Sequence, residues 1–310
     1  MSAAMRGHLA MLIFSGLIAG SFALGSLAAP HIAPAALNAM RFTLASVLVG
    51  AAALATTGLK RSDFAAPWRY VILGALMGIY FVLMFEGLKT APPVSAAAVF
   101  TLSPILSGIA GYILLRQITT RRMALALAVG AAGALWVIFR ADVAALLDFR
   151  IGRGEAIYFW GCVAHAVYTP LVRLLNRGQS PIVFSFGTIV AAAIILTLVG
   201  AGDLIRLDWG AMPVIVWITL AYVTIFATAL TFVLLQYASL RLPSAKVMAY
   251  TYLTPSWVIC WQMALGNPLP PALVLVGVAL TVVALVLLLK NEEGRTSPRN
   301  QQRRRGVNTG

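Results

Sequence analysis

The 310-residue sequence predicts an all-α polytopic membrane protein with ten transmembrane helices, arranged as two inverted five-helix repeats. Its composition is 61% hydrophobic and 10% charged with a mean hydropathy of +0.90, whereas a soluble domain carries about 25% charged residues. Apolar runs long enough to cross a bilayer recur along the whole chain. In addition, a stretch punctuated by prolines in the first half has a counterpart 151 residues later.

Ten apolar runs predict the transmembrane spans, because a helix needs about 20 residues to cross the hydrocarbon core of a bilayer. The predicted spans are residues 8–28, 34–57, 66–88, 92–114, 121–139, 152–175, 180–200, 211–237, 243–264 and 270–289. The longest connection, residues 140–153, separates an N-terminal repeat over 1–145 from a C-terminal repeat over 146–290. Residues 291–310 are polar and rich in arginine, which predicts a disordered basic tail.

The distribution of Lys and Arg predicts that both termini lie in the cytoplasm. When the charges are assigned to alternate sides of the ten spans, 17 fall on the side of the termini and five on the other. Cytoplasmic loops carry the excess of Lys and Arg, so topology explains the net charge of +14 without nucleic acid. Five is an odd number of spans, and the second repeat is therefore expected to be inverted relative to the first.

Paired prolines mark the fourth and ninth spans. The stretch that opens at Pro92 has a second proline at Pro104, and the stretch that opens at Pro243 repeats this spacing with Pro255. An interior proline removes one helical hydrogen bond and frees a carbonyl, and lipid tolerates such a break only where protein or water covers it. Twelve residues rise about 18 Å, near the middle of a bilayer core of about 30 Å. Broken helices at matching positions of two halves predict a binding site between them.

Polar and aromatic side chains on single helical faces provide candidate solute-binding residues. Tyr250 and Trp257 share a face of the ninth span, as Tyr158, His165 and Tyr168 do on the sixth. An ionisable group near mid-span, such as His165, is costly in a membrane and is a functional candidate, although a hydrogen bond to a neighbouring helix explains it equally well. The complete predicted set is Tyr80, Met84, Ser103, Tyr158, His165, Tyr168, Tyr250, Tyr252 and Trp257.

Two charged residues inside the spans need partners. Arg41 and Glu86 both fall toward the external third of their spans when counted from the helix ends. A charge within the membrane is expensive unless it is paired. We therefore predict an Arg41–Glu86 ion pair with a structural or gating role.

Enzyme motifs are not found in the sequence. The histidines at positions 8, 31 and 165 lack metal-ligand spacing, and neither a GxSxG elbow nor a P-loop occurs. We therefore expect a protein that is not an enzyme and has no cofactor and no metal. The expected partners are an amino acid-like solute and the lipid bilayer, with anionic lipid at the basic tail. We expect no nucleic acid partner and a monomeric protein.

Three segments carry a resemblance to a known family. GLKTAPPVSAAAVFTLSPILSGIAGYILLRQITTRR, LRLPSAKVMAYTYLTPSWVICWQMALGNPLPP and NAMRFTLAS resemble the drug/metabolite transporter superfamily, EamA type, over nearly the whole chain. Within it the chain is similar to the ten-helix exporters of aromatic amino acids of the YddG type. The glutamate often found after the fourth and ninth spans of the family is Gln117 and Asn267 here. The loops at these two points must therefore be fixed by other groups.

The resemblance implies a secondary transporter that exports small solutes from the cytoplasm across the bacterial inner (plasma) membrane. We expect it to work by alternating access and to carry aromatic or other neutral amino acids and related metabolites. One alternative is a carrier for another metabolite or a drug-like cation of the same superfamily. Others are a channel, a carrier of lipids or nucleotide sugars and a membrane-embedded enzyme.

Overall fold

The computed structural model describes residues 3–118, 120–148 and 150–289, and all regular elements in these ranges are helices. In chain order the elements are α1 (Ala3–Ala28), α2 (Pro34–Thr56), η1 (Arg61–Phe64), α3 (Trp68–Gly87), α4 (Pro93–Phe100), α5 (Ser103–Leu115), α6 (Arg121–Ile138), α7 (Val143–Leu147), α8 (Arg153–Leu175), α9 (Pro181–Ile205), α10 (Val214–Thr224), η2 (Ile225–Leu230), α11 (Thr231–Ser239), α12 (Ser244–Ala249), η3 (Tyr250–Leu253), α13 (Thr254–Ala264) and α14 (Ala272–Leu289).

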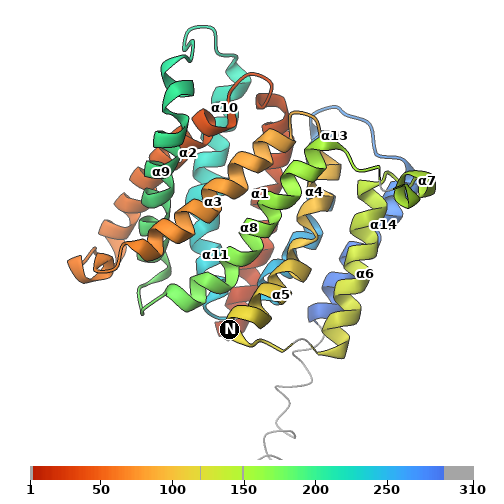
Figure 1. Cartoon of the computed structure of the whole chain (residues 1–310), viewed down its shortest axis with the longest axis horizontal. Coiled ribbons are helices and arrows are strands. Elements are labelled where there is room, and N and C mark those ends of the chain that lie inside the picture. Colours follow the sequence, from red (N-terminus) through yellow and green to blue (C-terminus); the bar gives the residue numbers. More distant parts are fainter. Residues whose placement is uncertain (1–2, 119, 149, 290–310) are drawn as a thin grey trace, which may run out of the picture.

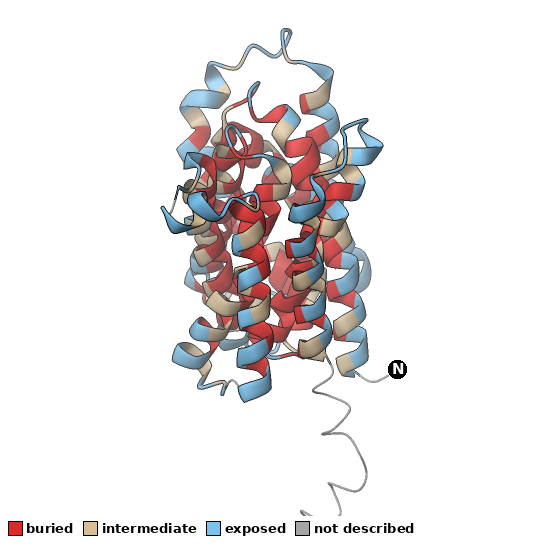
Figure 2. Cartoon of the chain, turned by 90° about the vertical axis from the view of Figure 1, so that its right-hand side faces the viewer, coloured by how far each residue is buried: buried red, intermediate tan, exposed pale blue. Residues whose placement is uncertain are grey.

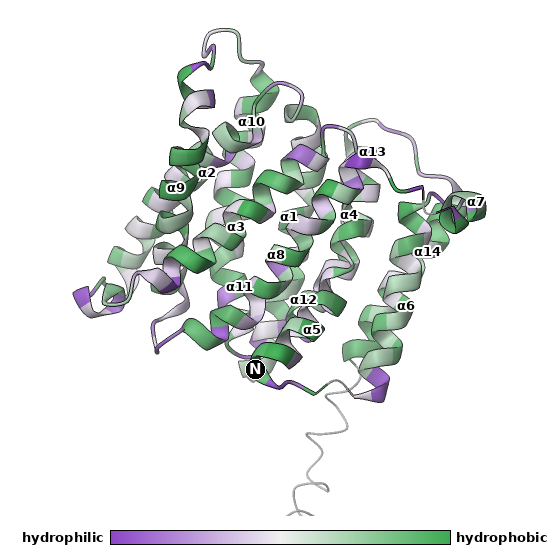
Figure 3. Cartoon of the chain, in the orientation of Figure 1, coloured by the Kyte–Doolittle hydropathy of each residue, from purple (hydrophilic) through white to green (hydrophobic). Residues whose placement is uncertain are grey.

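Eight helical stretches among the described residues are long and apolar enough to cross a membrane. They are α1, α2, α3, α4–α5, α6, α9, α10–η2–α11 and α14. Large apolar side chains point outward from these helices, with Leu198 73%, Val47 66% and Leu54 65% exposed. Hydrophilic residues gather at the two ends of the helices (Figure 3). The protein is therefore a polytopic membrane protein whose apolar outer surface suits lipid.

The helices form one bundle with two closely packed pairs at its edges (Figure 1). α2 packs along α9 at one edge, and α6 packs along α14 at the other. Between them α8 lies against α3 and α5, and α1 contacts α10, α11 and α13. Buried residues line the inner faces of these helices and exposed residues their outer faces (Figure 2). The interior is thus built from helices of both halves of the chain.

The two stretches with paired prolines are interrupted in the same way. α4 ends at Phe100, and α5 begins at Ser103, immediately before Pro104. In the second half α12 gives way to a 3-10 turn, η3, and α13 begins one residue before Pro255. Each interior proline thus stands in the first turn of a new helix, where its missing N–H costs nothing.

Gln117 links the ends of these two broken helices. Its side-chain Oε1 accepts a hydrogen bond of 3.0 Å from the backbone N–H of Ser244, the first residue of α12. The first N–H groups of a helix have no partner within the helix, so a side chain that accepts from one stabilises the helix end. Gln117 therefore fixes this loop without the negative charge that a glutamate would bring.

Glycine allows α3 to approach α9 closely at one point. A Cβ atom added to Gly74 would lie 2.6 Å from the backbone nitrogen of Ala192, whereas one added to Gly78 would meet the Leu196 side chain at 3.5 Å. We expect Gly74→Ala to lower the free energy of unfolding by about 1–3 kcal/mol, because the two backbones must separate. Gly78→Ala, one helical turn away, is the matched control and should not lower the melting temperature of the purified protein. Equal melting temperatures for the two variants would contradict this packing.

Several element boundaries differ from the sequence predictions. α1 begins at Ala3 rather than at residue 8, and α9 continues to Ile205 rather than ending at residue 200. The predicted connection 140–153 contains the short helix α7, which Asp142 caps by accepting from the N–H of Ala145 at 3.0 Å. The basic tail predicted over 291–310 lies outside the described residues.

Candidate solute-binding site

Rings from six helices meet in the centre of the bundle. We call the following nine side chains the aromatic cluster: Phe22, Phe42, Tyr80, Phe81, Phe100, Tyr158, His165, Tyr168 and Phe232. They come from α1, α2, α3, α4, α8 and α11, and each is buried. Both halves of the chain therefore contribute to one continuous surface of rings.

Tyr80 lies at the middle of the aromatic cluster. Its ring centroid is 4.5 Å from those of both Phe81 and His165 and 5.9 Å from that of Tyr158. The Tyr158 hydroxyl donates a hydrogen bond to the Tyr80 hydroxyl at 3.1 Å. Tilted and edge-to-face ring pairs at these distances are favourable, so the rings stabilise one another in the interior.

One side of the aromatic cluster is polar and incompletely hydrogen-bonded. The side-chain nitrogen of Gln236, on α11, donates to the Tyr168 hydroxyl at 3.0 Å and to Thr188 Oγ1 at 3.4 Å. The Gln236 Oε1 and His165 Nδ1 atoms are buried and have no hydrogen-bond partner. A buried polar atom without a partner costs about 1–3 kcal/mol, and such atoms are rare in folded proteins. Eleven buried side-chain atoms of the described residues lack a partner, and these two lie in the aromatic cluster or on a residue that contacts it.

The predicted site residues separate into two groups in space. Tyr80, Tyr158, His165 and Tyr168 meet in the aromatic cluster. Met84 and Ser103 are fully buried on α3 and α5, the two helices that pack against α8.

The three predicted residues of the ninth span lie elsewhere. The Tyr250 hydroxyl is 3.1 Å from His8 Nδ1, near the start of α1. Tyr252 packs over Gly130 of α6, where an added Cβ would lie 2.3 Å from its ring. Trp257 is 41% exposed, and its Nε1–H donates to Ser15 Oγ of α1 at 3.3 Å.

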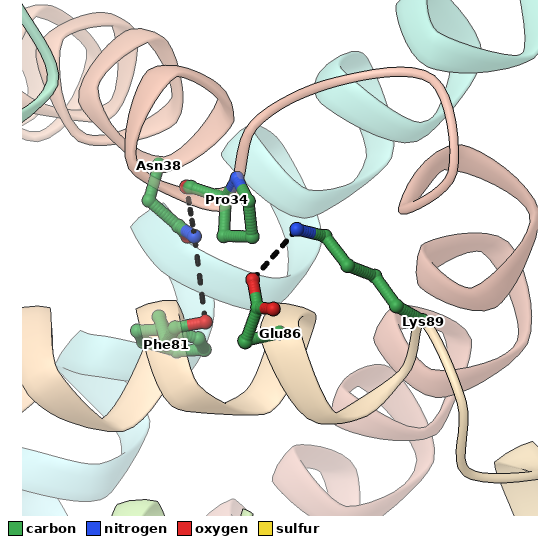
Figure 4. A network of polar contacts seen from close by, with 5 residues as sticks. All are labelled: Pro34, Asn38, Phe81, Glu86 and Lys89. Carbon is green, nitrogen blue, oxygen red and sulfur yellow. Dashed lines mark hydrogen bonds and ion pairs between the residues drawn. The ribbon is translucent and has the colours of Figure 1, made fainter. Parts of the chain in front are cut away.

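The predicted ion pair between Arg41 and Glu86 is not formed. Glu86 pairs instead with Lys89, one helical turn away, at 2.7 Å (Figure 4). Asn38 of α2 donates to the Phe81 carbonyl of α3 at 3.4 Å and to the Pro34 carbonyl at 2.9 Å (Figure 4). Arg41 is fully buried and turns toward η2. Glu86 lies in the last turn of α3, so it does not reach the depth of Arg41.

Two buried polar residues belong to no sequence motif: Gln236, which contacts the aromatic cluster, and Glu155, at one end of the bundle. Gln236 is a lone amide in the apolar run TFVLLQYAS, and this isolation is the signal that identifies it. Glu155, in the first turn of α8, is 3% exposed and accepts a hydrogen bond from Ser95 Oγ at 2.7 Å. A buried carboxylate with one neutral partner joins α8 to α4 at this end of the bundle.

Close backbone contacts hold the same end of the bundle together. A Cβ atom added to Gly154 would lie 2.3 Å from the Gly87 carbonyl oxygen, so α8 and the end of α3 touch through their backbones. At the other end, which carries the N-terminus in Figure 1, a Cβ atom added to Gly7 of α1 would lie 3.2 Å from the Leu242 side chain. Helices from the two halves of the chain therefore approach each other closely at both ends of the bundle.

The family of the chain follows from comparison with known proteins. The model of the EamA-like transporter family matches residues 5–139 and again residues 152–290, and together these stretches cover most of the chain. The chain belongs to the EamA-like transporter family. This transporter is 26% identical over 265 residues to a protein of Bacillus subtilis (strain 168) named as the uncharacterized transporter YyaM. The aligned stretch covers 84% of this chain and 87% of the relative.

A solved structure shares the fold of this transporter. A crystal structure described only as that of a protein matches with a TM-score of 0.67 and 22% sequence identity, over 92% of this chain and 96% of the other. At that identity the likeness shows the fold alone. The aromatic cluster thus lies at the centre of a multi-pass membrane transporter.

Proposed function

We propose that this transporter is a secondary carrier of amino acids, with the aromatic cluster as its solute-binding site. The observation that supports the proposal is that two buried atoms without hydrogen-bond partners, His165 Nδ1 and Gln236 Oε1, lie beside the buried rings. Rings suit an apolar side chain, and lone pairs on nitrogen or oxygen accept from an ammonium group. Aromatic amino acids offer both features. The protein is proposed to move its solute without chemical change, as a carrier and not as an enzyme.

The proposed architecture is ten spans in two inverted five-helix repeats. α8 and residues 244–264 supply the two spans beyond the eight most apolar ones, and both pack within the bundle. The two matches to one family model and the proline interruptions at α4–α5 and α12–α13 support a duplicated unit. Inverted repeats with broken helices are typical of alternating-access carriers.

The proposed orientation places both termini in the cytoplasm and the contact between Gly87 and Gly154 on the external side. It rests on the excess of Lys and Arg on one side of the spans. In the bacterial inner membrane this orientation lets the cytoplasmic end admit a metabolite for export. The carrier is proposed to release it outward when α8 separates from α3 and α4.

Flux from liposomes tests the proposal. Purified protein is reconstituted and loaded with labelled phenylalanine, tryptophan, leucine or glutamate, and efflux is followed with and without a pH gradient. We expect saturable efflux of phenylalanine, tryptophan and leucine, and little of glutamate, because a second carboxylate has no cationic partner among the rings. Efflux equal to that of empty liposomes for all four amino acids would overturn the proposal.

A further inference from the structure

Arg41 is a fully buried cation whose partners are all neutral. Its guanidinium donates to Thr228 Oγ1, to the Ala227 carbonyl at 2.6 Å and to Asn38 Oδ1 at 3.4 Å. The guanidinium carbon also lies 3.8 Å from the centre of the Phe81 ring. Among the described residues no carboxylate forms an ion pair with Arg41. The positive charge of Arg41 is therefore not neutralised by a carboxylate of the described residues.

A second buried arginine shows how the fold neutralises such a charge elsewhere. Arg69 is 1% exposed, and its guanidinium donates to the Leu175 carbonyl at 2.7 Å and to the Ala66 carbonyl at 3.2 Å. Leu175 is the last residue of α8, and the C-terminus of a helix carries about half a negative charge. Ala227, by contrast, lies within the continuous stretch α10–η2–α11, away from any helix end. Arg41 therefore lacks the contact with a helix C-terminus that stabilises the positive charge of Arg69.

The segment that holds Arg41 has unusual backbone geometry. Ala227 and Thr228 belong to η2, a π-helical turn over Ile225–Leu230. The wider turn leaves the Ala227 carbonyl available to Arg41, while the Thr228 hydroxyl donates to the Val223 carbonyl at 2.7 Å. Single π-helical turns inside α-helices are rare and occur frequently at functional sites. The turn thus fixes the guanidinium in the interior, where a charge is expensive.

Phe81 connects the guanidinium to the aromatic cluster. The Phe81 ring has Arg41 within 3.8 Å of its centre and lies 4.5 Å from Tyr80 and 6.4 Å from Phe232 between centroids. A solute ring seated among these side chains would carry its polar groups toward Arg41 on one side. On another side lie His165 Nδ1 and Gln236 Oε1, which have no partners. The aromatic cluster thus has a cation against one of its rings, and two acceptors without partners elsewhere along it.

We propose that Arg41 binds the carboxylate of the transported solute. This inference rests on the proposed function and narrows its solutes to aromatic or large apolar compounds with one carboxylate. Guanidinium and carboxylate form two parallel hydrogen bonds, and the pair removes the cost of an unpaired charge in the interior. Apolar amines without a carboxylate are then poor solutes, because they would leave Arg41 uncompensated.

The first arm of the test compares phenylalanine, phenylalaninamide and 3-phenylpropionate as ligands of the wild-type protein. Binding is read as thermal stabilisation in detergent and as inhibition of phenylalanine flux. We expect the amide to bind at least about 30-fold more weakly than phenylalanine, because a buried cation loses its partner. 3-Phenylpropionate retains the carboxylate and should still compete. Equal binding of the amide and the acid would overturn the inference.

The second arm uses Arg41→Gln with Arg69→Gln as the matched control. In Arg41→Gln the amide and phenylalanine should bind equally, whereas Arg69→Gln should keep the wild-type preference in its folded fraction. An unchanged preference in Arg41→Gln would overturn the inference, and if that variant does not fold, the wild-type comparison decides. If phenylalanine and phenylalaninamide are transported equally well, the carboxylate site is wrong but the carrier proposal stands. If phenylalanine binds selectively but is not transported, the carrier proposal is wrong but the carboxylate site stands.

Discussion

Replacing His165 with alanine is expected to reduce phenylalanine flux at least about 100-fold, which corresponds to about 2.7 kcal/mol of binding and transport energy. The change removes a ring 4.5 Å from Tyr80 and 5.4 Å from Phe100, together with the unpartnered Nδ1 atom. Flux is measured in liposomes that contain equal amounts of folded protein. Tyr80→Phe, which removes only the hydroxyl that accepts from Tyr158, should lower flux far less.

Trp160→Ala is the matched control for this prediction. Trp160 lies on the same helix, α8, but its side chain is 65% exposed on the outer surface of the bundle. Loss of this ring removes more apolar area than loss of His165 and yet should leave flux close to that of the wild type. The site assignment is wrong if His165→Ala and Trp160→Ala transport phenylalanine at similar rates.

Cross-linking α4 to α8 at the proposed external end is expected to stop flux completely. Ser95 Oγ and Glu155 Oε1 are 2.7 Å apart, so cysteines at these two positions suit a short reducible bifunctional thiol reagent. Ser95 and Glu155 are themselves buried, so burial does not protect Cys162 from the reagent, and both Cys162 and Cys260 are first replaced by serine. Flux of the double-cysteine protein should fall to background after reaction and return after reduction, because release requires α8 to leave α4.

A cross-link between α6 and α14 provides the control for reagent and chemistry. Trp136 Nε1 donates to the Leu273 carbonyl at 2.8 Å, so these positions lie on facing parts of α6 and α14 and a bifunctional thiol reagent that spans an indole side chain suits cysteines there. α6 and α14 meet through Gly133 and Gly277, whose added Cβ atoms would lie 2.6–2.8 Å from the facing carbonyl oxygens. This pair is expected to stay together during transport, and its cross-link should leave flux unchanged. Full flux through protein cross-linked at positions 95 and 155 contradicts the proposed opening.

Features set by local chemistry were predictable from the sequence. The breaks before Pro104 and Pro255 follow from the missing N–H of proline, and the apolar runs follow from the needs of a bilayer. The π-helical turn over Ile225–Leu230 was not predictable, because its sequence IFATAL contains neither proline nor glycine. It forms where Arg41 of a distant helix binds the Ala227 carbonyl, a contact that no local pattern encodes.

Which candidate residues lie together was predictable where they share one helix face. Tyr158, His165 and Tyr168 follow the helical period of α8, and they meet in the aromatic cluster. The Arg41–Glu86 pair was wrong because counting along a helix gives the depth of a residue but not the neighbouring helix that it faces. α2 packs mainly on α9, and Arg41 turns toward η2.

Tyr250 and Trp257 show what the helical period gives at a broken helix and what it omits. Both contact α1, Tyr250 at His8 and Trp257 at Ser15, so their predicted common face persists across the 3-10 turn over Tyr250–Leu253. Tyr252 faces another way and packs on α6. The helical period gives the shared face but not the helix that the face meets.

Counterflow tests the central claim most directly, namely that the aromatic cluster is open to one side of the membrane at a time. Liposomes with reconstituted protein are loaded with unlabelled phenylalanine and diluted into a trace of labelled phenylalanine. A carrier of this kind predicts transient accumulation of label inside above its final equilibrium level, and His165→Ala should show none. Label that enters wild-type liposomes only up to equilibrium, without an overshoot, would contradict alternating access and indicate a pore.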